Sequence, residues 1–285
     1  MDIIEILKAV ILGIVEGITE WLPVSSTGHM ILVDEFLKLD VSKEFNDMFT
    51  VVVQLGAIMA VVVLYWKNIF PFGKKNNMHP LSEKGAGAYI KTDVFQMWFK
   101  TLVACIPAAV IGLLFDDWLE EHLLNPWVVA VALIVFGIAF IVIENWNKGR
   151  SARINSIADL TYKAALIIGL FQLIAAVFPG TSRSGATIVG ALLIGISRTV
   201  AAEFTFYLAI PVMFGASLLK LVKFGMDFTA MEVTILLTGM AVAFAVSIVV
   251  IRFLMDYIRK HDFKIFGWYR IVLGALVLGY FALTM

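Results

Sequence analysis

The stretch EWLPVSSTGH, residues 20–29, places a glutamate, a proline, three hydroxyl side chains and a histidine in the middle of an apolar segment. A second stretch of this kind, VFPGTSRSGA, occupies residues 177–186. Of the 285 residues, 61% are hydrophobic and only 15% are charged, and the mean hydropathy is +0.92. Such a chain is too apolar for a water-soluble domain and belongs in a bilayer. Its formal net charge of zero predicts no nucleic-acid partner.

Six other stretches are long and apolar enough to cross a bilayer, which takes about 20 residues of α-helix. The segments 3–37 and 160–196 are also apolar, but a polar stretch breaks each of them into halves too short to cross. We therefore predict an all-α integral membrane protein, a single domain of residues 1–285, with six transmembrane helices and two re-entrant hairpins of broken helix. The predicted spans are 46–66, 95–115, 126–144, 200–219, 232–251 and 266–285.

Loop charges predict which end faces the cytoplasm, where Lys and Arg gather. The stretch DDWLEEH, residues 116–122, has four acidic residues and no Lys or Arg, so we expect it outside. Lys220 and Lys223 are exceptions on that side. The basic stretches expected in the cytoplasm are 67–93, which includes Lys75, 145–163 and 252–264.

The two broken segments resemble each other at an offset of 156 residues. LGIVEGITEWLPVSST (12–27) then aligns with IGLFQLIAAVFPGTSR (168–183), which predicts two related halves, 1–150 and 155–285. Three spans separate the hairpins, so the second half should be inverted relative to the first. Non-helical backbone at membrane depth must be buried in protein or line water, so the two tips should meet. The alignment pairs Gly13 with Gly169, Glu16 with Gln172, Pro23 with Pro179, and Ser26 with Ser182.

Both tips have the composition of a helix start. A proline is expected to open each new helix, and hydroxyl side chains fill its first turn. Taken singly, such motifs are more often plain helix caps. Two opposed helix starts would also offer free N–H groups and positive dipole ends to an anion, and Arg183 adds a fork suited to phosphate, unless it only pairs with a glutamate. The expected anion-binding residues are Ser25, Thr27, Thr181, Ser182 and Arg183.

Glu16 and Glu20 lie one turn apart on the first half-helix, where like charges repel. A shared proton, a divalent cation or Arg183 could neutralise them, unless one simply faces water, and two carboxylates beside a phosphate suit magnesium. His29 follows Ser26 by three residues on the next helix and should share its face. The pair offers a nucleophile and a base, although a lone histidine in an apolar helix is more often a core residue.

The motifs EGITEWLPVSSTGH (16–29) and PGTSRSGAT (179–187) resemble the two signatures of the undecaprenyl-diphosphate phosphatase family, the bacitracin-resistance type of membrane phosphatase. The similarity extends through QLGAI (54–58) and EFTFYLAIP (203–211), and Trp21 replaces the phenylalanine more usual in that family. The resemblance implies removal of the terminal phosphate from a polyprenyl diphosphate for cell-wall synthesis, in the bacterial inner (plasma) membrane. It also implies a site facing the outer side and a divalent cation, Mg²⁺ or Ca²⁺. By motif position, that site would contain Glu16, Glu20, Ser26, Thr27, His29, Ser182 and Arg183.

As a mechanism we expect Ser26 to attack phosphorus while His29 or Glu20 takes its proton, with Arg183 stabilising charge and Glu16 and Glu20 holding the cation. Phosphorylation of His29 and direct attack by water stay open alternatives. The main rival function is a secondary transporter or flippase for a phosphate-bearing lipid or anion, which inverted repeats with broken helices also fit. A homodimer could form through small residues, such as Gly112, Ala132 and Gly137.

Overall fold

The computed structural model describes residues 3–74, 77–225 and 227–284, so Lys75 of the first basic connector lies outside it. Across these ranges the chain is helical, with isolated β-bridges and no strand of a sheet, which confirms the predicted all-α class. The helices are α1 (Ile3–Thr19), α2 (Ser26–Phe36), α3 (Lys43–Val52), α4 (Gln54–Leu64), α5 (Trp66–Ile69), the 3₁₀ helix η1 (Gly85–Tyr89), α6 (Thr92–Leu123), α7 (Pro126–Trp146), α8 (Tyr162–Val177), α9 (Arg183–Leu193), α10 (Arg198–Phe224), α11 (Ala230–Ile258) and α12 (Lys264–Thr284).

Six helical segments of the described residues are long and apolar enough to cross a membrane, and each overlaps one predicted span. The first is interrupted at Val53, which separates α3 from α4. Large apolar side chains such as Leu114 and Val222, 70% and 71% exposed, form an outer surface that suits lipid and not water. The protein is therefore a multi-pass membrane protein. The segments are Lys43–Leu64, Thr92–Phe115, Pro126–Trp146, Arg198–Phe224, Ala230–Ile258 and Lys264–Thr284.

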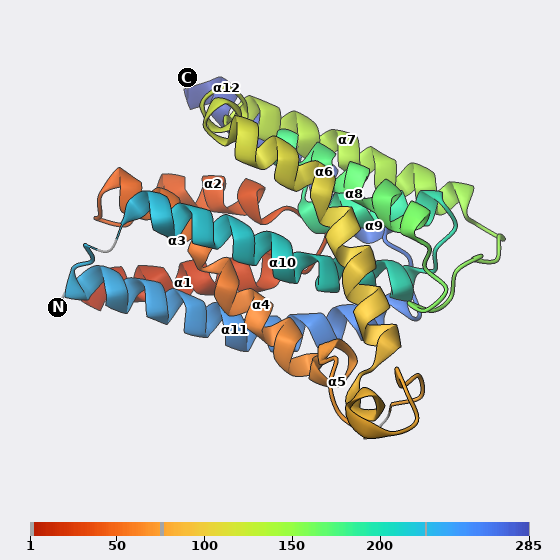
Figure 1. Ribbon diagram of the computed structural model, residues 1–285. Helices are drawn as coiled ribbons and strands as arrows, with labels where there is room; N and C mark the ends of the chain where they lie inside the picture. Colours follow the sequence, from red (N-terminus) through yellow and green to blue (C-terminus); the bar gives the residue numbers. More distant parts are fainter. Residues whose placement is uncertain (1–2, 75–76, 226, 285) are drawn as a thin grey trace.

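Two pairs of shorter helices, α1 with α2 and α8 with α9, pack among the long ones (Figure 1). The second helix of each pair has 11 residues, or about 17 Å at 1.5 Å per residue. That is little more than half of a hydrocarbon core about 30 Å thick. The turns of these pairs, residues 20–25 and 178–182, lie within the two polar stretches, and the chain changes direction there (Figure 1).

Each short pair packs on a long helix through a glycine. α1 runs along α11, and α8 runs along α6. A Cβ on Gly13 would lie 2.6 Å from the carbonyl oxygen of Gly239, and one on Gly169 would lie 2.4 Å from that of Ala104. Both distances are shorter than any real contact, so the backbones approach this closely only because the side chain is absent.

The small residues considered for a homodimer are mostly used within the chain. Ala132 is buried, and a Cβ on Gly137 of α7 would lie 2.7 Å from the carbonyl oxygen of Gly267 of α12. Gly137 thus belongs to the contact between α7 and α12. A Cβ added to Gly112 would have no neighbouring atom within 4 Å.

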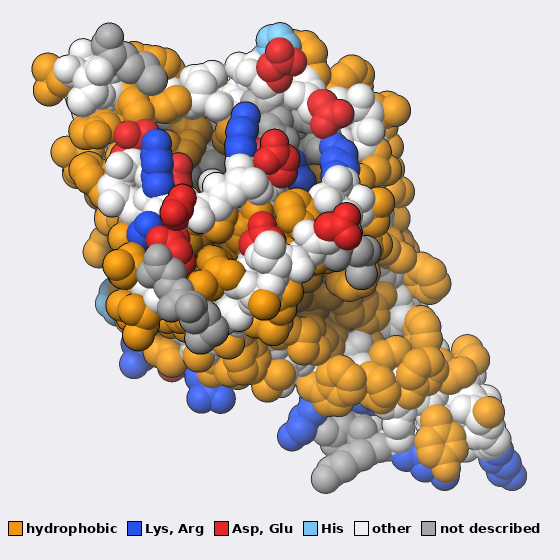
Figure 2. Space-filling view, turned by 90° about the vertical axis from the view of Figure 1, so that its left-hand side faces the viewer, with side chains coloured by type: hydrophobic (Ala, Val, Ile, Leu, Met, Phe, Trp, Pro, Cys, Tyr) orange, Lys and Arg blue, Asp and Glu red, His pale blue; other side chains and the backbone are white. Residues whose placement is uncertain are grey.

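The two ends of the bundle differ in charge. Figure 2 looks onto the end that carries the beginning of α1 and the end of α10, where acidic and basic side chains intermingle and apolar side chains cover the flank. Here Lys223 of α10 donates to Asp117 of α6 at 2.8 Å, and this hydrogen bond lowers the pKa of the exposed Asp117 carboxyl. The basic connectors, around Lys67, Lys91 and Lys148, lie at the other end.

A methyl group at the contact of α8 with α6 should destabilise the fold. Gly169→Ala places a Cβ against the rigid backbone of α6, so the unfolding free energy should fall by about 1–3 kcal/mol. The matched control is Gly279→Ala on α12, where an added Cβ meets no atom within 4 Å and alanine favours the helix. Unfolding is measured in detergent micelles, and equal stability of the two variants would contradict the packing.

Candidate functional site

The two turns have the same cap geometry. α2 begins at Ser26 and α9 at Arg183, and each is preceded by a serine with left-handed backbone, φ 74° at Ser25 and 68° at Ser182. Each cap hydroxyl accepts a hydrogen bond from the amide three residues on, at 3.3 Å and 3.1 Å. No other non-glycine residue of the described ranges has a positive φ, and strain of this kind is typical of functional sites.

The expectation that a proline opens each new helix is wrong. Pro23 and Pro179 lie in the turns, three and four residues before the first helical residue. The helix begins after the serine because the serine hydroxyl satisfies a free N–H group of its first turn. The helix starts one residue further from the proline in the second turn than in the first, so in the structure Ser26 corresponds to Arg183 and not to Ser182.

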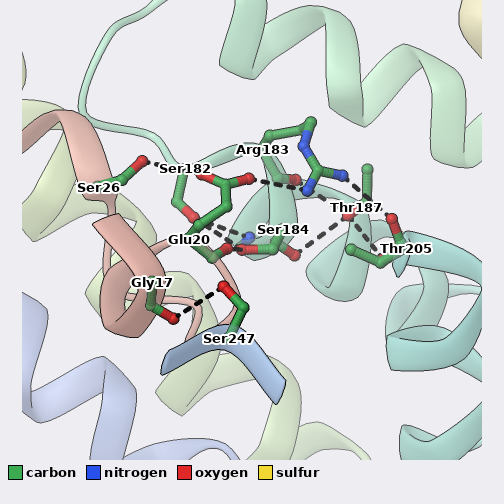
Figure 3. A network of polar contacts seen from close by, with 10 residues as sticks. Gly17, Glu20, Ser26, Ser182, Arg183, Ser184, Thr187, Thr205 and Ser247 are labelled. Atoms are coloured by element: carbon green, nitrogen blue, oxygen red, sulfur yellow. Dashed lines mark hydrogen bonds and ion pairs between the residues drawn. The ribbon is translucent and has the colours of Figure 1, made fainter. Parts of the chain in front are cut away.

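Glu20 joins the two turns. Its Oε2 accepts a hydrogen bond from Ser26 Oγ at 3.0 Å, and its Oε1 accepts one from Arg183 Nη2, also at 3.0 Å. The backbone carbonyl of Glu20 accepts a third from Ser184 Oγ at 3.2 Å. Both charged side chains are largely buried, with 8% of Glu20 and 14% of Arg183 exposed. One carboxylate therefore connects a hydroxyl of the first turn with the guanidinium of the second (Figure 3).

Arg183 is held from the far side as well. Its Nη1 donates to the carbonyl oxygen of Thr205 on α10 at 3.1 Å, and Thr205 in turn contacts Thr187 of α9. The buried Nε has no hydrogen-bond partner. The guanidinium is thus fixed in direction by two hydrogen bonds, while its buried Nε has no partner.

A cavity of about 680 Å³ opens beside this junction. Glu16, Ser26 and Thr27 line it near the turns, and it extends past α6 and α10 to Lys220. Much of its wall is apolar, including Leu12, Met30, Ile31, Ala108, Leu113, Val212 and Leu219. The cavity therefore combines a largely apolar wall with polar side chains, both near the turns and further along at Asp34, Asn46, Asp47, Thr50, Gln54 and Lys220.

Glu16 fits a cation better than Glu20 does. Its side chain is 1% exposed, and its Oε1 has no hydrogen-bond partner, whereas both carboxylate oxygens of Glu20 are engaged. Among the described residues, no group of three or more potential metal-ligating side chains is found. Magnesium requires only one or two carboxylates when phosphate oxygens and water complete its shell. Glu16 therefore has an unpaired carboxylate oxygen that fits a divalent cation held jointly with a phosphate.

The remaining hydroxyl residues are helix caps, fully buried, or part of the cavity wall. Ser25 and Ser182 use their hydroxyls as caps, and Ser182 Oγ also lies 3.1 Å from Ser184 Oγ. Thr181 is fully buried, and its Oγ1 has no partner. Thr27 lines the cavity. Thr27 is thus the one of these side chains that borders the cavity directly.

The structure does not bring His29 onto Ser26. The Nδ1 of His29 lies 2.7 Å from the carbonyl oxygen of Ser25, and its Nε2 lies 2.6 Å from the hydroxyl of Tyr269 on α12. The carbonyl can only accept, so Nδ1 donates to it and a neutral ring then accepts from Tyr269. The ring also stacks on Tyr269, with centroids 5.6 Å apart. Both nitrogens are therefore occupied away from the nucleophile candidate.

Arg270 is the residue that the sequence interpretation missed. It lies on α12, is fully buried, and forms no ion pair within the described part of the chain. Instead Nη1 donates to the carbonyl oxygen of Pro23 at 3.2 Å, and Nη2 donates to those of Gly180 and Thr181 at 3.0 Å and 2.7 Å. One guanidinium thus ties both turns together. A cation inside the apolar run 264–284 was the available signal.

Comparison with known proteins gives one family. The sequence profile described as bacitracin resistance protein BacA matches residues 9–276. An undecaprenyl-diphosphatase of Desulfitobacterium hafniense is 63% identical over 282 residues, covering 99% of this chain and 98% of the relative. One from Enterococcus faecalis is 62% identical over 278 residues, 98% of each chain. Undecaprenyl-diphosphatase 1 of Clostridium acetobutylicum is 61% identical over 284 residues, the full length of both.

Loss of the Arg270 fork should weaken the whole protein. Arg270→Met leaves at least three buried carbonyls of the turns without a donor, so the unfolding free energy should drop by roughly 3 kcal/mol or more. Arg270→Lys, which lacks the fork, should lose nearly as much. Arg252→Met, at an exposed position of α11, is the control. Detergent unfolding curves for Arg270→Met and Arg252→Met that coincide would refute the role.

Proposed function

We propose that this chain, which belongs to the bacitracin resistance protein BacA family, hydrolyses undecaprenyl diphosphate to undecaprenyl phosphate and inorganic phosphate. Full-length relatives at 61–63% identity are named undecaprenyl-diphosphatase. The structural observation that carries the proposal is the contact of Glu20 with both Ser26 and Arg183. This contact supports the proposed roles of Ser26 as nucleophile, Glu20 as proton acceptor and Arg183 as the phosphate-binding group. The lipid product would serve again as a carrier in cell-wall synthesis.

Ser26 is the proposed nucleophile. Its hydroxyl already donates to Glu20, so this carboxylate can take the proton as Oγ attacks the terminal phosphorus. The bond from that phosphorus to the bridging oxygen breaks, and undecaprenyl phosphate leaves. Water then hydrolyses the phosphoserine, releasing phosphate and restoring the hydroxyl.

Arg183 supplies the main electrostatic stabilisation. Phosphoryl transfer depends mostly on positioning and on stabilising charge at the equatorial oxygens. Arg183 has a free Nε and a second nitrogen that Glu20 holds until substrate binds. The N–H groups that begin α2 and α9 add positive dipole ends. Thr27, Ser25, Thr181 and Ser182 complete the proposed substrate-binding set.

His29 is assigned a supporting place in this mechanism. Its ring would have to leave Tyr269 before it could reach Ser26, whereas Glu20 needs no movement. We therefore propose that His29 holds the first turn through the Ser25 carbonyl. Trapping and mapping a phosphorylated enzyme distinguishes the alternatives: label on His29 would indicate phosphohistidine, and direct attack by water would leave no phosphorylated enzyme.

Glu16 and Glu20 are the proposed ligands of a divalent cation, Mg²⁺ or Ca²⁺. The orphaned carboxylate oxygen of Glu16 beside the cavity supports this assignment. When bound, the cation would neutralise charge on the diphosphate. The apolar wall of the same cavity suits the polyprenyl chain, since it runs from the turns toward the outer face of the bundle.

The two helix pairs are proposed to be re-entrant hairpins of an inverted repeat, with halves 1–150 and 155–285. The packing supports this, because α1 contacts α11 in the same way that α8 contacts α6. Glu16 and Gln172 occupy matching positions, and both are buried with unpaired polar atoms. Only the first can ligate a cation as a charged group, so the proposed cation ligands lie in the first half, while Arg183 comes from the second.

The site is proposed to face the outer side of the bacterial inner (plasma) membrane. The cavity extends along the later parts of α6 and α10 toward Leu124 and Lys220, at the end that carries the acidic stretch 116–122. The basic connectors lie at the opposite end, which the distribution of Lys and Arg assigns to the cytoplasm. A homodimer stays a prediction that no contact here supports beyond the open position of Gly112.

Phosphate release tests the function. Purified protein in detergent should release inorganic phosphate from undecaprenyl diphosphate, lose this activity with a chelator, and regain it with magnesium or calcium. Arg183→Ala should be at least about a hundredfold slower, since one preorganised donor contributes about 3 kcal/mol, while Arg150→Ala, in an exposed loop, should match the parent.

A rate for Arg183→Ala within about threefold of the parent would exclude Arg183 from the chemistry. Exchange of the lipid between vesicles without release of phosphate would instead favour the transporter or flippase.

A further inference from the structure

A second cavity of about 350 Å³ lies at the basic end of the bundle. Its wall is formed by α5, the beginning of α6, the beginning of α10 and the loop before α8. The first cavity contacts the same two long helices only further along, from Cys105 on α6 and from Pro211 on α10. The two cavities therefore lie toward opposite ends of the molecule.

Two buried ammonium groups line this second cavity. Lys91 and Lys100 are each 7% exposed. Nζ of Lys91 has one contact, with the carbonyl oxygen of Lys67 at 3.5 Å, and Nζ of Lys100 has one, with that of Ala158 at 3.2 Å. Neither forms an ion pair with any residue that the structure describes. An ammonium has three N–H donors, so each retains donors beyond its single carbonyl contact.

Buried charges of one sign normally require a partner, because removing an ammonium from water without a counter-charge costs several kcal/mol. Lys67 adds a third cation at the exposed rim. Asp93 and Glu203 also line the wall, and Asp159 interacts electrostatically with Lys100, but among the described residues none of the three acids forms an ion pair with Lys91 or Lys100. Glu203 accepts a hydrogen bond from the Tyr207 hydroxyl at 2.5 Å, and Asp93 is exposed.

We propose that this cavity is a second anion site that takes a phosphate group, either free phosphate or the phosphate of a lipid monoester. Lysine binds phosphate as a point charge, and two buried ammonium groups with an exposed third match an anion that carries up to two charges. The cavity is large enough for a phosphate with its water. The cavity lies at the end of the transmembrane segments, at the depth of lipid headgroups. It is open to the outside at its rim, where Lys67 is exposed.

Protection of lysines from acylation tests the site in the unaltered protein. The full chain is placed in phosphatidylcholine nanodiscs and treated with acetic anhydride, and modification of each lysine is read by mass spectrometry. The arms contain inorganic phosphate, chloride at the same ionic strength, or undecaprenyl phosphate in the bilayer. At about ten times its dissociation constant, the ligand should slow acylation of Lys91 and Lys100 about tenfold and leave the exposed Lys148 unchanged.

The arms separate the sources. Protection by inorganic phosphate identifies a site for the free anion, and protection only by undecaprenyl phosphate identifies a lipid headgroup site. Equal protection by chloride, or none in any arm, would overturn the proposal. Because no hydrolysis is measured, these outcomes do not depend on the proposed phosphatase activity.

Variants give an independent measurement. In an Arg183→Ala background, which weakens the first site, Lys91→Met with Lys100→Met should lower the affinity for radiolabelled phosphate at least about tenfold, and Lys148→Met should not. Lys100→Arg should retain most of the binding because it keeps the charge. Unaltered affinity in the folded double variant would overturn the proposal, and the acylation result decides if that variant does not fold.

Discussion

The structure depends on satisfying two stretches of irregular backbone in the interior of an apolar bundle. Loop carbonyls at that depth have no water to bind, and the Arg270 guanidinium supplies their donors: Pro23 from one turn, and Gly180 and Thr181 from the other. A buried cation is costly without compensation, and here the compensation is the same set of carbonyls. The carbonyls thus offset the cost of burying the Arg270 cation, and the guanidinium satisfies the buried carbonyls. The two turns are fixed against each other as a result.

The chemistry follows from that fixed arrangement. Once the turns meet, Glu20 can accept from a hydroxyl of its own turn and from Arg183 of the other, 163 positions away in sequence. The helices that follow the cap serines Ser25 and Ser182 begin close to the same region. Glu16 lines the cavity, whereas Gln172, its counterpart in the sequence alignment, carries no charge. The two acids of the proposed site, Glu16 and Glu20, thus both come from α1 and the turn that follows it.

Sequence reasoning predicted the spans because long apolar runs are strong local signals, and interruptions such as EWLPVSSTGH singled out Glu20, Ser26 and Arg183, which the structure brings into contact. It failed where tertiary contacts decide. The helix starts depend on cap geometry at Ser25 and Ser182 and not on the prolines, which shifts the match of the repeat by one residue. His29 shares a helix with Ser26, yet Tyr269 draws its ring away. Arg270 carried a visible signal, but its carbonyl partners are not encoded in any local pattern.

The most direct test of the central claim is a double-mutant cycle across the two turns, with Glu20→Gln, Arg183→Gln and both together, read as unfolding free energy in micelles. Contact between the turns predicts that the two losses are coupled by about 1 kcal/mol or more, since either single change strands a buried charge. Losses that add within about 0.5 kcal/mol would contradict the contact, and with it the arrangement from which the proposed chemistry follows.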